Sequence, residues 1–192
     1  MVHSSGRTVM RFSTGTKLKS NMRKLWCTGF EGFKQLVEAN GWTESVPDDI
    51  AIISINNGSD TSPANECHLC TGDNVLNLDF DDVDPVALNF PSDATEGSYQ
   101  TNTGETVKLH FFTDEQAQTA VDFIEKHKDK NFYVHCSAGI SRSQAFIRYI
   151  NTVYDELWHR NPQNPCVHPN GFVLQKLMQC WRKKNNYENI FT

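Results

Sequence analysis

The segment from His135 to Ser143 carries the strongest chemical signal in the chain. Cys136 closes an apolar stretch that predicts a strand, and Arg142 opens a pattern that predicts an amphipathic helix. Residues 137–141, called the Cys136 loop below, are small or neutral. Backbone N–H groups in such a loop, at the start of a helix, can converge on a tetrahedral anion. The sequence therefore predicts an oxyanion site beside a thiol.

The side chains of this segment suit an attack on a phosphate ester. A helix N-terminus and a nearby guanidinium stabilise a thiolate, which makes Cys136 the predicted nucleophile. The planar fork of Arg142 can grip two phosphate oxygens at once. Ser143 could donate a hydrogen bond to the sulfur when a covalent intermediate breaks down, and His135 is expected to orient the loop by hydrogen bonding. The other predicted phosphate-binding residues are the members of the Cys136 loop: Ser137, Ala138, Gly139, Ile140 and Ser141.

The string HCSAGISRS resembles the signature loop of the protein tyrosine phosphatase superfamily, and its ending is most similar to the compact dual-specificity branch. Residues 81–84 (DDVD) and 112–117 (FTDEQA) are similar to segments of stand-alone microbial and phage members. The resemblance extends over residues 50–181. It implies a phosphatase of that fold, a cysteinyl-phosphate intermediate, a neutral Asp that protonates the leaving oxygen, and no metal or cofactor.

The resemblance does not place the proton donor by spacing alone. In the family this Asp lies on a loop after a strand, and the usual distance before the cysteine falls here near Gly104, where there is no Asp. Matching the strand instead gives Asp82, with Asp81 as its close competitor. A long insertion then separates this acid loop from the helix expected at Thr113. The remaining candidates are Asp84, Asp93 and Asp114.

Apolar periodicity predicts an α/β fold with a mostly parallel central sheet flanked by helices. Residues 50–55 (IAIISI) form a continuous β-branched run, which is typical of a parallel strand buried on both faces. Strands alternating with helices favour this architecture. Residues 81–107 show no period and are expected to lack regular structure. The expected strands are 22–27, 50–55, 75–80 and 131–136, and the expected helices are 30–39 and those beginning near 113, 142 and 170.

Composition narrows the functional class. A net charge of −5 argues against a general nucleic-acid binder. No apolar run approaches the ~18 residues of a membrane span, and no secretory signal is visible, which indicates a cytoplasmic protein. Residues 1–21 are basic and are expected to be a tail, and residues 22–192 a single catalytic domain.

The main prediction is a protein phosphatase acting on phosphotyrosine, phosphoserine or phosphothreonine, with a phosphorylated protein as its partner. Two other readings use the same scaffold: an RNA 5′-triphosphatase or phosphoinositide phosphatase, and a phosphate-binding module without turnover. A zinc site is a further alternative, because a C-x2-C pair could be completed by a later cysteine and histidine. Its ligands would be Cys67, Cys70, Cys166 and His168.

Overall fold

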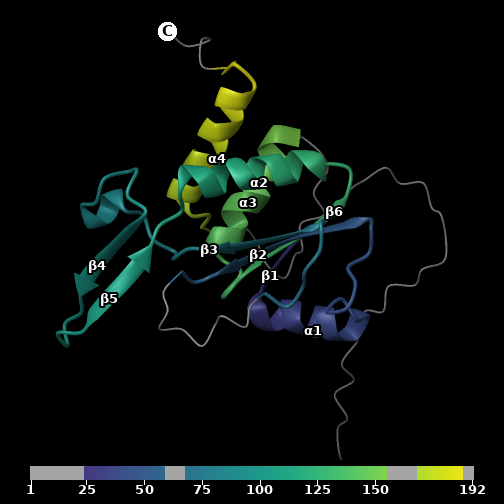
Figure 1. The fold of residues 1–192 in the computed structure, drawn as a ribbon, viewed down its shortest axis with the longest axis horizontal. Helices are drawn as coiled ribbons and strands as arrows, with labels where there is room; N and C mark the ends of the chain where they lie inside the picture. Colours follow the sequence, from purple (N-terminus) through teal and green to yellow (C-terminus); the bar gives the residue numbers. More distant parts are fainter. Residues whose placement is uncertain (1–23, 59–67, 155–167, 188–192) are drawn as a thin grey trace, which may run out of the picture.

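A computed structural model describes residues 24–58, 68–154 and 168–187. Its centre is a four-stranded sheet in the order β1-β6-β2-β3, and all three pairings are parallel (Figure 1). The predicted α/β fold with a parallel central sheet is confirmed. The strands of this sheet are β1 (Leu25–Gly29), β2 (Ile50–Asn56), β3 (Val75–Asp79) and β6 (Asn131–Cys136).

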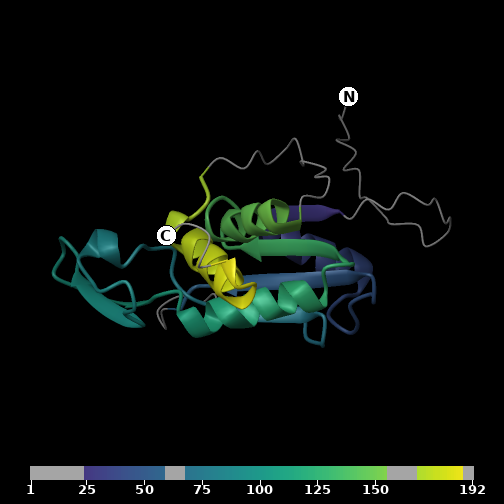
Figure 2. The ribbon, with the colours of Figure 1, turned by 90° about the horizontal axis from the view of Figure 1, so that it is seen from above.

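Helices cover both faces of the sheet. Among the described elements, α1 lies on one face, and α2, α3 and α4 lie on the opposite face (Figures 1 and 2). Within the described ranges, none of these helices is both long and apolar enough to cross a membrane. Their bounds are α1 (Phe30–Asn40), α2 (Asp114–Lys126), α3 (Arg142–Tyr154) and α4 (Gly171–Lys184).

The strand β2 explains why the core has two parts. Every residue of β2 is buried, and its side chains alternate between the two faces. Ile53 and Ile55 pack into the larger cluster under α2, α3 and α4, whereas Ile50 and Ile52 pack against Phe33 of α1. A strand enclosed in this way must be apolar throughout, as the continuous run in the sequence predicted.

Two helix ends follow their predicted local chemistry. Thr113 and Gln116 form a capping box at the start of α2, with bonds of 3.1 Å from the Gln116 N–H to the Thr113 hydroxyl and 3.0 Å in return. Gly41 ends α1 in the left-handed conformation, at a φ of 69°. Both ends fix where a connecting segment leaves the helix.

The segment predicted to lack structure contains a second, antiparallel sheet, so that prediction was wrong. A short 3-10 helix, η2 (Val86–Leu88), precedes the hairpin of β4 (Glu96–Gln100) and β5 (Thr106–His110). The hairpin extends beyond the carboxyl ends of β2 and β3 (Figures 1 and 2). Of its strand residues only Leu109 is buried, so the sequence carries no alternating apolar pattern to reveal it.

The first strand was predicted too early. The sequence suggested residues 22–27, whereas β1 runs from Leu25 to Gly29 and ends beside the Cys136 loop. Met22 and the basic tail proposed for residues 1–21 lie outside the described residues.

Candidate active site

The Cys136 loop joins the end of β6 to the start of α3. Cys136 is the last residue of β6, and it lies opposite Gly29 of β1 in the parallel register. Arg142 is the first residue of α3. The strand, turn and helix expected from the sequence are therefore present, with the thiol and the guanidinium at the carboxyl edge of the sheet.

The Cys136 thiol is almost completely buried, with 2% of the residue exposed. Its sulfur accepts a hydrogen bond from the Gly139 N–H at 3.3 Å, and the Ser143 hydroxyl oxygen lies 3.2 Å away. The same hydroxyl lies 3.1 Å from the Cys27 sulfur on β1. The sulfur therefore lies among a backbone donor, a hydroxyl and the start of α3.

Gly139 lets the loop lie directly on β1. Its φ is +75°, and a Cβ on this residue would lie 2.4 Å from the Gly29 nitrogen and 2.5 Å from the Thr28 carbonyl carbon. The Phe30 N–H, at the start of α1, donates to the Ser137 carbonyl at 3.0 Å. The loop is thereby held against β1 and α1 as well as by its own helix.

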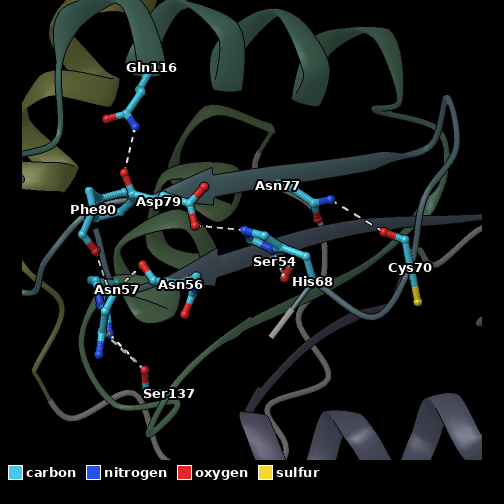
Figure 3. A network of polar contacts seen from close by, with 11 residues as sticks. Ser54, Asn56, Asn57, His68, Cys70, Asn77, Asp79, Phe80, Gln116 and Ser137 are labelled. Atoms are coloured by element: carbon cyan, nitrogen blue, oxygen red, sulfur yellow. Dashed lines mark hydrogen bonds and ion pairs between the residues drawn. The ribbon is translucent and has the colours of Figure 1, made fainter. Parts of the chain in front are cut away.

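Arg142 is anchored by one end of its guanidinium. Its Nη1 donates to the carbonyls of Asn56 and Phe80, at 2.9 and 2.7 Å, which lie where β2 and β3 end. Its Nη2 donates to Asn57 Oδ1 at 2.7 Å and to Ser137 Oγ at 3.1 Å. Figure 3 shows Asn56, Phe80, Asn57 and Ser137 gathered at this edge.

The Nε of Arg142 is buried and has no hydrogen-bond partner among the described residues. Leaving a buried donor of a charged group unsatisfied is costly. An anion in the Cys136 loop would supply the missing acceptor.

The other loop residues form the walls of this site. Ser137, Ala138 and Ile140 are exposed, Ser141 is half-buried and Gly139 is buried. With a relative exposure of 49%, Ile140 adds an apolar side chain at the rim.

The structure separates the two leading acid candidates. Asp82 is exposed, and its Oδ1 accepts hydrogen bonds from Ser141 Oγ at 2.7 Å and Asn170 Nδ2 at 2.9 Å. Asp81 is buried, and its Oδ2 accepts the His110 N–H of β5 at 2.8 Å. The Asp82 carboxylate therefore lies beside the Cys136 loop, whereas that of Asp81 fastens the hairpin to the acid loop.

The remaining acids have other contacts or positions. Asp84 accepts the N–H of Val86, the first residue of η2, at 2.9 Å. Asp114 pairs with the buried Lys176 of α4 at 2.5 Å. Asp93 is exposed in the segment before β4.

His135 does not make the hydrogen bonds expected of it among the described residues. Its ring is fully buried, neither ring nitrogen has a partner there, and it stacks on Phe33 at 3.9 Å between centroids. Burial lowers the pKa of His135 to about 3, with a smaller contribution from His68, so the ring is neutral. His135 therefore packs against Phe33 of α1 and makes no hydrogen bond to the Cys136 loop among the described residues.

The zinc alternative gains no support from the part of the chain that the structure describes. His68, which lies within the C-x2-C pair of the sequence, bridges Ser54 and Asp79, at 2.8 and 2.9 Å (Figure 3). Cys70 is buried, which raises the pKa of its thiol to about 11. No group of three potential ligands gathers within the described ranges, and Cys67 and Cys166 lie outside them.

Two polar residues of the site were not identified from the sequence. Asn57 contacts Arg142, and Asn170 joins the Cys136 loop to Asp82 and caps α4 through the Val173 N–H at 3.0 Å. The position of Asn57, directly after a buried strand, was the available signal, because parallel strands end at one edge. Nothing in the sequence ties Asn170 to Asp82.

Comparison with known proteins finds no matching family model and no matching curated protein. Nine solved chains are similar to this one. One is a PTP-2 phosphatase from Cydia pomonella, with 15% identity and a TM-score of 0.45, covering 83% of this chain and 86% of its own. Another is the human tyrosine phosphatase-like serine/threonine/tyrosine-interacting protein, with 19% identity and a TM-score of 0.44, covering 85% and 92%. A third is PTPMT1, with 14% identity and a TM-score of 0.39, covering 86% and 96%. The likeness concerns the fold alone.

Proposed function

We propose that this protein is a cysteine-dependent phosphatase that hydrolyses phosphomonoesters through a cysteinyl-phosphate intermediate. The observation that carries the proposal is the pairing of two groups at one loop. The buried Cys136 sulfur accepts the Gly139 N–H, and the buried Arg142 Nε lacks an acceptor among the described residues. A nucleophile and an unsatisfied cationic donor on the same loop suit a phosphoryl group.

In the first step the Cys136 thiolate attacks phosphorus in line with the leaving oxygen. The S–P bond forms, the P–O bond to the leaving group breaks, and Asp82 transfers its proton to that oxygen. The N–H groups of the Cys136 loop and the guanidinium of Arg142 hold the other three phosphoryl oxygens. The leaving group departs as a neutral alcohol or phenol.

In the second step water attacks the phosphorus of the intermediate while Asp82 accepts the water proton. The S–P bond breaks, and its electron pair returns to the sulfur. Ser143, whose hydroxyl lies 3.2 Å from that sulfur, donates a hydrogen bond to the departing thiolate. Inorganic phosphate is the product.

The contacts of Asp82 support its choice as the proton donor. The two hydrogen bonds that described residues donate to this carboxylate, from Ser141 and Asn170, both reach Oδ1. A carboxylate oxygen that accepts two donors is the less favourable site for a proton, so Oδ2 would carry it. Asp81 differs in position, because it is buried and its carboxylate accepts the His110 N–H of the hairpin.

The substrates proposed are proteins phosphorylated on tyrosine, serine or threonine. The Cys136 loop contains no cation, and Arg142 follows it directly, so one phosphate is held by one guanidinium. The exposed Ile140 offers an apolar surface to the part of the substrate next to the phosphate. RNA 5′-triphosphates and phosphoinositides, with several phosphates, would meet no further cation in this loop.

The test is turnover of p-nitrophenyl phosphate. Cys136→Ser should lower kcat by more than ~10³-fold, since a neutral hydroxyl replaces the thiolate. Arg142→Lys should lower kcat/KM by roughly 10²-fold or more because lysine cannot form the bidentate fork. Equal rates for wild type and Cys136→Ser would exclude the mechanism. Phosphotyrosine and phosphoserine peptides, a triphosphorylated RNA and a phosphoinositide then compare the substrate classes.

A further inference from the structure

We infer that Asn57 is a positioning residue for Arg142, the side chain proposed to bind the phosphate. Asn57 orients Nη2 of Arg142 without neutralising the guanidinium. The inference rests on the proposed function, because it assigns how the same site grips a phosphate. Asn57 directly follows β2 and is half-buried at the edge of the sheet where the Cys136 loop lies (Figure 3).

A count of donors shows which edge of the guanidinium can receive an anion. Arginine has five N–H groups, and the two on Nη1 go to the carbonyls of Asn56 and Phe80. Those carbonyls belong to the ends of β2 and β3, so a ligand cannot displace them without disturbing the sheet. The remaining edge is the one formed by Nε and Nη2, and on it only the N–H of Nε lacks a partner among the described residues.

The two nitrogens of this edge are in different states. Nε has no partner among the described residues, whereas Nη2 is held by Asn57 Oδ1 at 2.7 Å and Ser137 Oγ at 3.1 Å. Since a guanidinium has no acceptor, the amide oxygen of Asn57 must be the atom that faces it. Ser137 Oγ also lies 3.4 Å from that oxygen, so Asn57 contacts both Arg142 and the Cys136 loop.

The neutrality of Asn57 is what makes this contact compatible with binding. None of the ion pairs among the described residues involves Arg142, so its charge remains available to a ligand. A carboxylate at position 57 would pair with Nη2 as an internal anion and would compete with a phosphate dianion. An amide oxygen fixes the direction of Nη2 and adds no such competition.

The experiment measures tungstate binding by calorimetry in the full chain, with p-nitrophenyl phosphate kinetics and thermal melting on the same proteins. Asn57→Asp should raise the tungstate Kd by about tenfold or more, with KM rising more than kcat falls. Its Tm should not fall, because the new carboxylate pairs with Arg142. Asn57→Ala, which only removes the acceptor, should raise the Kd by about threefold or more.

Asn77→Asp is the matched control, because it adds the same charge at an exposed position on the neighbouring strand β3. It should leave the tungstate Kd unchanged. If Asn57→Asp binds tungstate as tightly as Asn77→Asp does, the role assigned to Asn57 is wrong while the proposed function stands. If wild type neither binds tungstate nor turns over the substrate, the proposed function itself is wrong.

Discussion

Asp81 and Asp82 are neighbours in the chain but face different partners. The Asp81 carboxylate is buried against the amide of His110, and the Asp82 carboxylate is exposed beside Ser141. A proton donor must reach the leaving oxygen and exchange protons with water, which only an accessible carboxylate can do.

Asp82→Asn should therefore lower kcat for phenyl phosphate by roughly 10²-fold or more, since the phenolate of high pKa needs a proton. The effect should be much smaller with a leaving group of low pKa, and the basic limb of the pH–rate profile should disappear. Asp81→Asn should keep that limb. If Asp82→Asn keeps the pH–rate profile of wild type, another residue is the proton donor.

His135 provides a prediction for stability at acid pH. Its folded pKa is about 3, below the ordinary value of 6.5, because burial opposes the charged ring. Between these values the unfolded chain binds a proton that the folded chain does not, so the free energy of unfolding falls as the pH drops from 6.5 towards 3. The slope from this residue reaches about 1.4 kcal/mol per pH unit.

Replacing the ring with one that does not titrate should remove this part of the slope. His135→Phe keeps an aromatic face against Phe33, so denaturant melts from pH 7 to pH 4 should show a smaller loss than wild type. His127, whose pKa is also lowered by burial, contributes to both proteins alike. Identical slopes for the two proteins would contradict the assignment.

Among the individual site residues, the sequence predicted those that lie close together in the chain. Cys136 and Arg142 are separated only by their loop, so their motif is readable by eye. Asn57 and Asn170 reach the site through tertiary contacts, and no local spacing records those. The hydrogen bonds expected of His135 gave way to stacking because α1 places Phe33 against the ring.

The Cys136 loop is the element on which the site depends, and Gly139 is the residue that allows its close packing. Gly139→Ala combines a left-handed backbone with a Cβ that would lie 2.4 Å from Gly29 N. It should abolish measurable turnover and should destabilise the fold by more than backbone strain alone. Chemical denaturation and p-nitrophenyl phosphate assays measure both effects.

Gly41→Ala separates strain from crowding. Gly41 has a similar φ of +69°, yet no atom lies within 4 Å of the position of its Cβ. This variant should lose about 1–2 kcal/mol of stability and keep its activity. Equal losses in the two variants would show that contact with β1 is unimportant.

The elements themselves were predictable where burial imposes a period. β2, β6 and the capped start of α2 appear at the expected places because their apolar spacing and end residues are local signals. β4 and β5 were missed because most of their residues are exposed to solvent. Such a hairpin does not require apolar and polar residues to alternate along its strands. The start of β1 was displaced because pairing with β6, a long-range contact, decides it.

The described part of the molecule divides into a sheet covered on both faces and a projecting hairpin. β2 lies inside the sheet with every residue buried, whereas β4 and β5 are mostly exposed. Local opening requires little apolar surface to be uncovered in the hairpin and a great deal in the sheet. In hydrogen exchange followed by mass spectrometry, amides of β4 and β5 should exchange well before those of β2 and β6. Equal protection would mean that the hairpin opens only with the whole domain.

The way the Cys136 loop lies on β1 has a consequence for synthesis. The carbonyl of Gly139 lies 3.5 Å from the Cys27 sulfur across a chain separation of 112 residues. Although β1 is translated before β6, it has no partner strand among the described residues until β6 has been made, because it lies at the edge of the sheet beside β6 alone. Hence a nascent chain that ends before β6 offers β1 no partner strand among the described elements, and the pocket cannot form until α3, which carries Arg142, has also been made.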